Sequence, residues 1–137
     1  MEGETKFHVI PIDGTLVDIR RTFVELGSSL LRRPLRYAVA PEPPHTLGRL
    51  SVAAGLDERD ARRIRRLIEL EIVDFWLTVP ATETGAMLLA LPPNGPGPPT
   101  IFYAKRVKTR GNSVLLQTIA WLERHGFHSP IVWCEEE

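Results

Sequence analysis

Cysteine is nearly absent from this chain, because Cys134 is the only one among 137 residues. A single thiol cannot form an intrachain disulfide, and it excludes the paired-cysteine frameworks of zinc ribbons. Net charge is absent as well, since 17 Lys and Arg balance 17 Asp and Glu. Proteins that bind nucleic acid generally need an excess of positive charge, so nucleic acid is not predicted as a partner.

Apolar segments suited to a membrane are also lacking. The longest uncharged stretch, residues 84–104, contains five prolines and three glycines and cannot form a spanning helix. The amino terminus has no basic start followed by a long apolar run, as a signal peptide would. These absences predict a soluble, cytoplasmic protein. A composition that is 43% hydrophobic and 25% charged predicts an ordinary globular domain.

Hydrophobic periodicity predicts strands separated by helices. Strand composition is found at residues 7–12, 100–107 and 129–134, and the first of these is expected to be buried. The order of strands and helices implies parallel pairing in a small three-stranded α/β sheet, with a helical insert after the first strand. All three tryptophans and Cys134 are expected in the core. The predicted helices span residues 17–33, 46–54, 57–76, 83–91 and 112–125, and residues 92–99 form a turn-rich hinge.

Residues 9–18 read Val-Ile-Pro-Ile-Asp-Gly-Thr-Leu-Val-Asp, an apolar strand that ends in an acidic turn. Asp-Gly is a common turn pair, and Asp or Thr can cap the next helix, so a purely structural role is one interpretation. The segment also resembles the first motif of the haloacid-dehalogenase-like (HAD) superfamily, hhhhDxDGTLVD. The match is close over residues 12–18. It puts Asp13 at the second Asp of the motif and Pro11 at the nucleophile.

The resemblance implies a Rossmann-like core of residues 1–17 and 92–137 and a helical C1-type cap of residues 18–91. It implies that Asp13 takes the general acid/base position and is a candidate magnesium ligand, with Gly14 and Thr15 beside the substrate. Thr109 falls where the second motif places a phosphate-binding Thr or Ser, although Lys108 fits one residue earlier. Arg110 is a further candidate for substrate binding. Magnesium is expected only if the family's activity survives.

The sequence departs from this family at positions that matter for catalysis. Pro11 carries no nucleophile, and the family's later basic and acidic motifs have no evident counterpart. Three glutamates, residues 135–137, could supply carboxylates, but they follow the third strand. The leading interpretation is therefore a catalytically impaired, truncated HAD-like scaffold that acts as a binding or protein-interaction module. The alternatives are a magnesium-dependent phosphatase of a small phosphate ester or nucleotide, and a piece of a longer HAD hydrolase.

The missing later strands also predict an uncovered edge on the first strand. Unpaired edge strands tend to associate with other chains, so a homo-oligomer or a protein partner is expected there. Pro11 would partly blunt this edge, because proline cannot donate to a sheet ladder.

Overall fold

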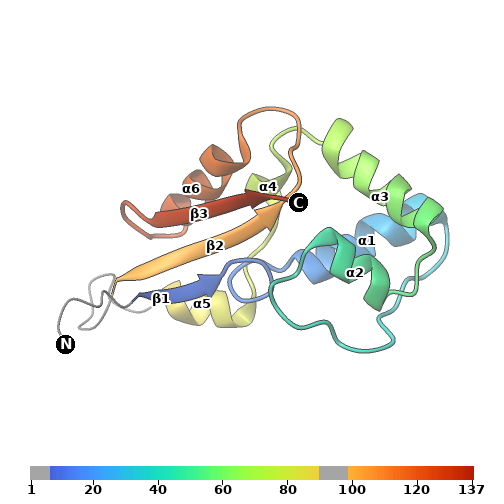
Figure 1. The fold of residues 1–137 in the computed structure, drawn as a ribbon, viewed down its shortest axis with the longest axis horizontal. Helices are drawn as coiled ribbons and strands as arrows, with labels where there is room; N and C mark the ends of the chain where they lie inside the picture. Colours follow the sequence, from blue (N-terminus) through green and yellow to red (C-terminus); the bar gives the residue numbers. More distant parts are fainter. Residues whose placement is uncertain (1–6, 90–98) are drawn as a thin grey trace.

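The structure, a computed structural model, describes residues 7–89 and 99–137. This part of the chain is mixed α/β, with a small parallel sheet and several helices (Figure 1). The elements are, in chain order, β1 (His8–Pro11), α1 (Ile19–Leu31), α2 (Leu47–Ala53), α3 (Glu58–Leu70), α4 (Phe75–Thr78), α5 (Glu83–Leu89), β2 (Thr100–Arg106), α6 (Val114–Arg124) and β3 (Ile131–Glu136).

The three described strands pair in the order β1-β2-β3, and both pairings are parallel. Ile10 of β1 is paired with Phe102 of β2, which in turn is paired with Val132 of β3. The predicted three-stranded parallel sheet is therefore confirmed. The strand β1 lies at one edge of this sheet, with β2 at the centre.

Pro11 is tolerated because its nitrogen faces away from the sheet. The amides of His8 and Ile12 donate to the carbonyls of Pro99 and Tyr103, at 2.9 and 2.8 Å. Successive amides of a strand point to opposite sides, so the nitrogen of Pro11 lies on the outer side of β1. The absence of an N–H on Pro11 therefore removes no hydrogen bond between β1 and β2. It leaves the outer edge of β1 with one backbone donor fewer.

Both strand connections leave their helices on one face of the sheet. They step in the same direction, from β1 to β2 and from β2 to β3, and right-handed crossovers that step one way place their helices on one side. On that side Phe102 meets Phe127, with ring centroids 5.0 Å apart. Strand side chains alternate between faces, so Tyr103 points to the opposite face.

The helix starts follow the caps that the sequence offers. Each cap side chain accepts a hydrogen bond from the backbone N–H three residues later, which satisfies one of the free donors of the first turn. None of the helices within residues 7–89 and 99–137 is long and apolar enough to cross a membrane. The five caps of this kind are Asp18, Thr46, Asp57, Thr82 and Ser113.

The prediction of one continuous helix over residues 57–76 is wrong, because α3 ends at Leu70 and α4 begins separately at Phe75. Asp74 between them has a left-handed backbone, with φ of 50°. Its amide donates to the carbonyl of Arg110 at 2.7 Å, and its carboxylate accepts from the amide of Asn112 at 2.7 Å. Contacts with the loop before α6 therefore replace the helical hydrogen bonds that periodicity alone would favour.

Two burial predictions are also wrong. Trp76 and Trp121 are buried as expected, but Trp133 is 56% exposed. The strand β1, expected to be buried, exposes Val9 by 57%. Both errors have one cause, since both side chains lie on the sheet face opposite the crossover helices.

The predicted cap and core are not cleanly separated in the chain. Helices α1, α2 and α3 contact one another and lie beyond the carboxyl ends of the strands (Figure 1). Helix α4 instead packs against α6, where the amide of Trp76 donates to Gln117 Oε1 at 2.9 Å. The end of the predicted insert thus belongs to the packing around the sheet. The predicted hinge, residues 92–99, lies outside the described residues except for Pro99.

We predict that Gly14→Ala destabilises the fold more than Gly126→Ala does. The two glycines have nearly the same φ, 99° and 98°, so the backbone strain of a side chain is matched, at about 1–2 kcal/mol. A Cβ at Gly14 would lie 2.7 Å from Nδ1 of the buried His45, whereas one at Gly126 meets nothing within 4 Å. Urea denaturation should show an additional loss of about 1–3 kcal/mol for Gly14→Ala. Equal losses would contradict the contact with His45.

Candidate functional site

The turn after β1 carries Asp13 into the interior, where it is 2% exposed. The amides of Leu16 and Val17 donate to the carbonyl of Ile12 at 2.9 and 3.0 Å, which closes a helical turn. Gly14 allows this turn through its positive φ. The backbone carbonyl of Asp13 accepts from the amide of His45 at 3.0 Å, so the residue is held at its main chain as well.

The carboxylate of Asp13 is fully engaged by Arg106, the last residue of β2. Nε and Nη2 of Arg106 donate to the two carboxylate oxygens at 2.8 and 2.7 Å, in the bidentate geometry of a strong ion pair. The guanidinium is 1% exposed. Its Nη1 donates to Thr118 Oγ1 of α6 at 2.9 Å, and its Cζ atom lies 4.4 Å from the ring centroid of Trp76 in α4.

This ion pair does not fit a magnesium site. Magnesium needs carboxylate oxygens with free lone pairs, and a guanidinium against both oxygens of Asp13 brings positive charge to the place a cation would occupy. Among the described residues, no group of three or more His, Cys, Asp or Glu side chains is placed to hold a metal ion.

The three glutamates after β3 are also engaged by protein groups. Glu135 accepts from the Tyr103 hydroxyl at 2.8 Å, and Glu136 lies 3.9 Å from the ammonium of Lys108. The carboxylate of Glu137 accepts from the first two amides of α2, at 2.9 and 2.8 Å. Their contacts place them at three separate points, and none contacts Asp13.

Gly14 and Thr15 share the turn of Asp13, whereas Thr109 and Arg110 make their contacts elsewhere. Thr109 Oγ1 accepts from the side chain of Gln117 at 2.9 Å, on the loop that leads to α6. Arg110 is exposed, and its carbonyl is bound by the amide of Asp74. The carbonyl of Thr15 accepts from the hydroxyl of Thr82, on the α5 side of the turn. Gly14 supports that turn through its φ of 99°.

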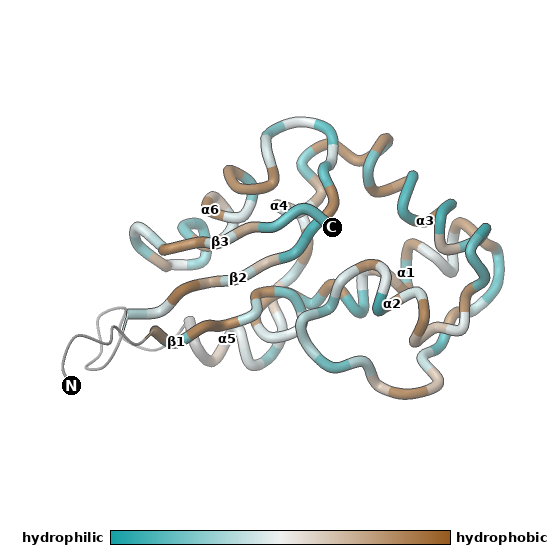
Figure 2. The backbone as a smooth tube through the Cα atoms, viewed as in Figure 1, coloured by the Kyte–Doolittle hydropathy of each residue, from teal (hydrophilic) through white to brown (hydrophobic). Residues whose placement is uncertain are grey.

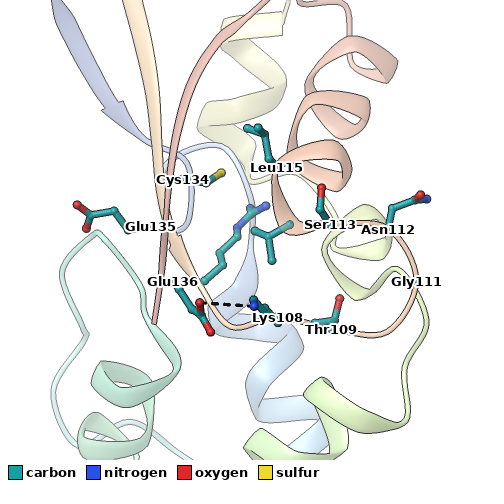
Figure 3. A pocket seen from close by; sticks show the side chains of 11 residues that line it. Lys108, Thr109, Gly111, Asn112, Ser113, Leu115, Cys134, Glu135 and Glu136 are labelled. Carbon is teal, nitrogen blue, oxygen red and sulfur yellow. Dashed lines mark ion pairs between the residues drawn. The ribbon is translucent and has the colours of Figure 1, made fainter.

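A cavity of about 370 Å³ lies at the carboxyl ends of β2 and β3, beside the first turn of α6 (Figure 3). The strands change there from apolar to hydrophilic residues (Figure 2). The positive charges on the wall are balanced, since Lys108 faces Glu136 and Arg106 is paired with Asp13. This balance gives a strongly anionic ligand such as phosphate no excess positive charge. The lining includes Arg106, Lys108, Thr109, Ser113, Cys134 and Glu136.

The sequence alone did not identify Arg106 as the partner of Asp13. The signal that could have found it is the strand period. Phe102 and Ala104 point inward, so Arg106 must do the same at the next alternate position. A buried cation needs a partner, and Asp13 is the acid at the end of the neighbouring strand. Gln117 and Trp76 carried no comparable signal.

Comparison of the chain with protein-family models, with curated proteins and with solved structures found no match.

We predict a strong energetic coupling between Asp13 and Arg106. Arg106→Met leaves an unpaired charge in the interior and should cost about 3–5 kcal/mol in unfolding free energy. Adding Asp13→Asn should recover part of that loss, because a neutral amide is less costly to bury unpaired than a carboxylate. Urea denaturation of the two single variants and the double variant measures the coupling.

The exposed pair of Arg62 and Glu58 provides the matched control for that cycle. Its atoms are 2.9 Å apart, like those of the buried pair, but both side chains are exposed to solvent. The same cycle there, with Arg62→Met and Glu58→Gln, should give a coupling under about 1 kcal/mol. Additive losses at Asp13 and Arg106 would contradict the role assigned to the buried pair.

Cys134 is predicted to be a slow nucleophile. Burial raises the pKa of its thiol, and its contact with Thr118 Oγ1, at 3.6 Å, opposes the rise without cancelling it. A higher pKa means less thiolate at a given pH, so iodoacetamide should alkylate the folded protein more slowly at pH 8 than the urea-unfolded chain. The rate should keep rising above the pH at which the unfolded thiol levels off. A folded rate equal to the unfolded one would contradict this assignment.

Proposed function

We propose that this chain is a HAD-like scaffold without catalytic activity that serves as a binding or protein-interaction module. The observation that carries the proposal is the bidentate ion pair, because Arg106 occupies both oxygens of the carboxylate that would act as general acid and base. Pro11 adds to it, since no nucleophile is available at the position where the family's attacking Asp stands. The ion pair on Asp13 and the proline at position 11 both support a scaffold without catalytic activity.

The HAD-like part of the proposal is supported by the motif and by the arrangement of elements. Residues 12–18 match the family motif, and they directly follow a strand of a parallel sheet. Helices α1 to α5 all fall between β1 and β2, where a C1-type cap is inserted. A Rossmann-like core and cap are therefore our interpretation of this α/β sheet. A lone, half-buried thiol is compatible with the reducing cytoplasm that the sequence predicts.

The competing function, a magnesium-dependent phosphatase, is tested directly by turnover. We predict that the protein does not hydrolyse para-nitrophenyl phosphate with magnesium above the rate of a buffer blank. We further predict that Pro11→Asp restores nothing, because Asp13 stays bound to Arg106 in that variant. Absorbance of released nitrophenolate measures both.

Asp13→Asn is the control for this assay. Turnover in the wild-type protein that disappears in Asp13→Asn would overturn the proposal, because it would show that the carboxylate is released from Arg106 and works. Turnover that survives Asp13→Asn and purifies with the protein would also overturn the proposal, because other groups of the chain would then carry the reaction.

A further inference from the structure

One face of the sheet is largely apolar, and no helix within residues 7–89 and 99–137 packs on it. The crossover helices occupy the other side, and in Figure 1 the strands β2 and β3 have no described helix in front of them. Parallel sheets are normally covered on both faces, so an uncovered apolar face of this kind indicates an interaction site. We call it the open face. Its members, by strand alternation and register, are Val9, Pro11, Ile101, Tyr103, Lys105, Ile131, Trp133 and Glu135.

The exposure on the open face is concentrated in large apolar side chains. Val9, Ile131 and Trp133 are 57%, 51% and 56% exposed. Val9 and Ile131 share one row across the three strands, through the pairings with Ile101. Trp133 stands in the next row against Tyr103, with ring centroids 5.5 Å apart. The apolar residues are therefore contiguous and not scattered.

The carboxyl end of the open face is polar and carries more positive than negative charge. Lys105 is exposed there, opposite Glu135 in the strand register. Glu135 already accepts a hydrogen bond from the Tyr103 hydroxyl. Burial, and then that bond, raise the pKa of Tyr103, and the charge of Arg49 opposes the rise, so a second cation acts on the same end. An occupant with acidic groups at this end would complement the two cations.

The dimensions of the open face select the kind of occupant. Three strands spaced about 4.8 Å apart and three rows of side chains give a patch of roughly 14 by 15 Å, about 200 Å². Stable protein dimers bury about 800 Å² on each partner, so this face alone is too small for a second copy. A helix of three turns is about 16 Å long and 10 Å wide, which matches the patch.

We propose that the open face binds an amphipathic helix of a protein partner, about three turns long, with acidic residues at the end that lies over Lys105. This deepens the proposed interaction function and rests on it. Apolar residues three and four positions apart on that helix would cover Val9, Ile131 and Trp133. The helix docks on the face rather than adding a strand at the edge of β1, where Pro11 removes a donor.

The test uses a synthetic helical peptide of about 14 residues, with leucines three and four apart and two glutamates at one end. Trp133 reports binding, because it is half exposed while Trp76 and Trp121 are buried. We expect its emission to shift to shorter wavelength, and the peptide to bind at least tenfold more tightly than a scrambled isomer of the same composition. Replacing the two glutamates with lysines should weaken binding severalfold.

Matched variants distinguish peptide binding at the open face from nonspecific binding elsewhere on the protein. Ile131→Lys and Val9→Lys should each abolish the shift while circular dichroism stays unchanged. Val52→Lys, at an 80% exposed apolar position on α2, should bind the peptide like the wild type. Equal binding of the scrambled peptide, or an equal loss in Val52→Lys, would overturn the proposal. Unchanged affinity for the peptide in which lysines replace the two glutamates would overturn the proposed preference for acidic residues.

Sedimentation velocity tests the alternative occupant. We expect a monomer at micromolar concentration, and a dimer that Ile131→Lys dissociates would replace the partner helix with a second copy. The peptide titration tests the docking site, and the phosphatase assay tests the absence of catalysis separately. Asp13-dependent turnover would overturn the proposed function without changing the peptide titration, and a flat titration would overturn the docking site while the absence of turnover stands.

Discussion

The guanidinium of Arg106 holds four segments of this chain in one arrangement. Arg106 is the last residue of β2. Its guanidinium binds the turn after β1 through Asp13, binds α6 through Thr118, and lies over the Trp76 ring of α4. Burying two charges costs several kcal/mol for each ion, and the bidentate bonds and the Thr118 bond offset that cost. The net gain in stability from such a pair is small. Its larger effect is on geometry, because this placement of the segments gives each nitrogen of the buried cation a hydrogen-bond partner.

The same contacts decide what chemistry is open to the site. With the guanidinium against both oxygens of Asp13, a metal ion that approached this carboxylate would meet positive charge. In the function that we propose, the carboxylate at the family's general acid/base position contributes to stability instead of catalysis.

The sequence predicted those features that local chemistry controls. Capping side chains such as Ser113 and glycines such as Gly126 mark where α6 begins and ends, and strand composition identified β1, β2 and β3. It failed where distant segments meet. The helix break at Asp74 results from contacts with the loop before α6, some forty residues later in the chain. No local sequence pattern indicates it. The partner of Asp13 was likewise out of reach, although the inward position of Arg106 could have been inferred from the strand period.

Strand alternation separates the two roles of the sheet. Even-numbered residues of β2, including Phe102 and Arg106, face the helices and build the core, while odd-numbered residues such as Tyr103 face outward. A change on one side leaves the other side's packing in place, since neighbouring residues of a strand share no side-chain contacts across the sheet. The direction of the crossovers then leaves the outward side without a helix of its own. Apolar faces of parallel sheets are generally removed from water by packing against another element, and the partner helix that we propose would do this here.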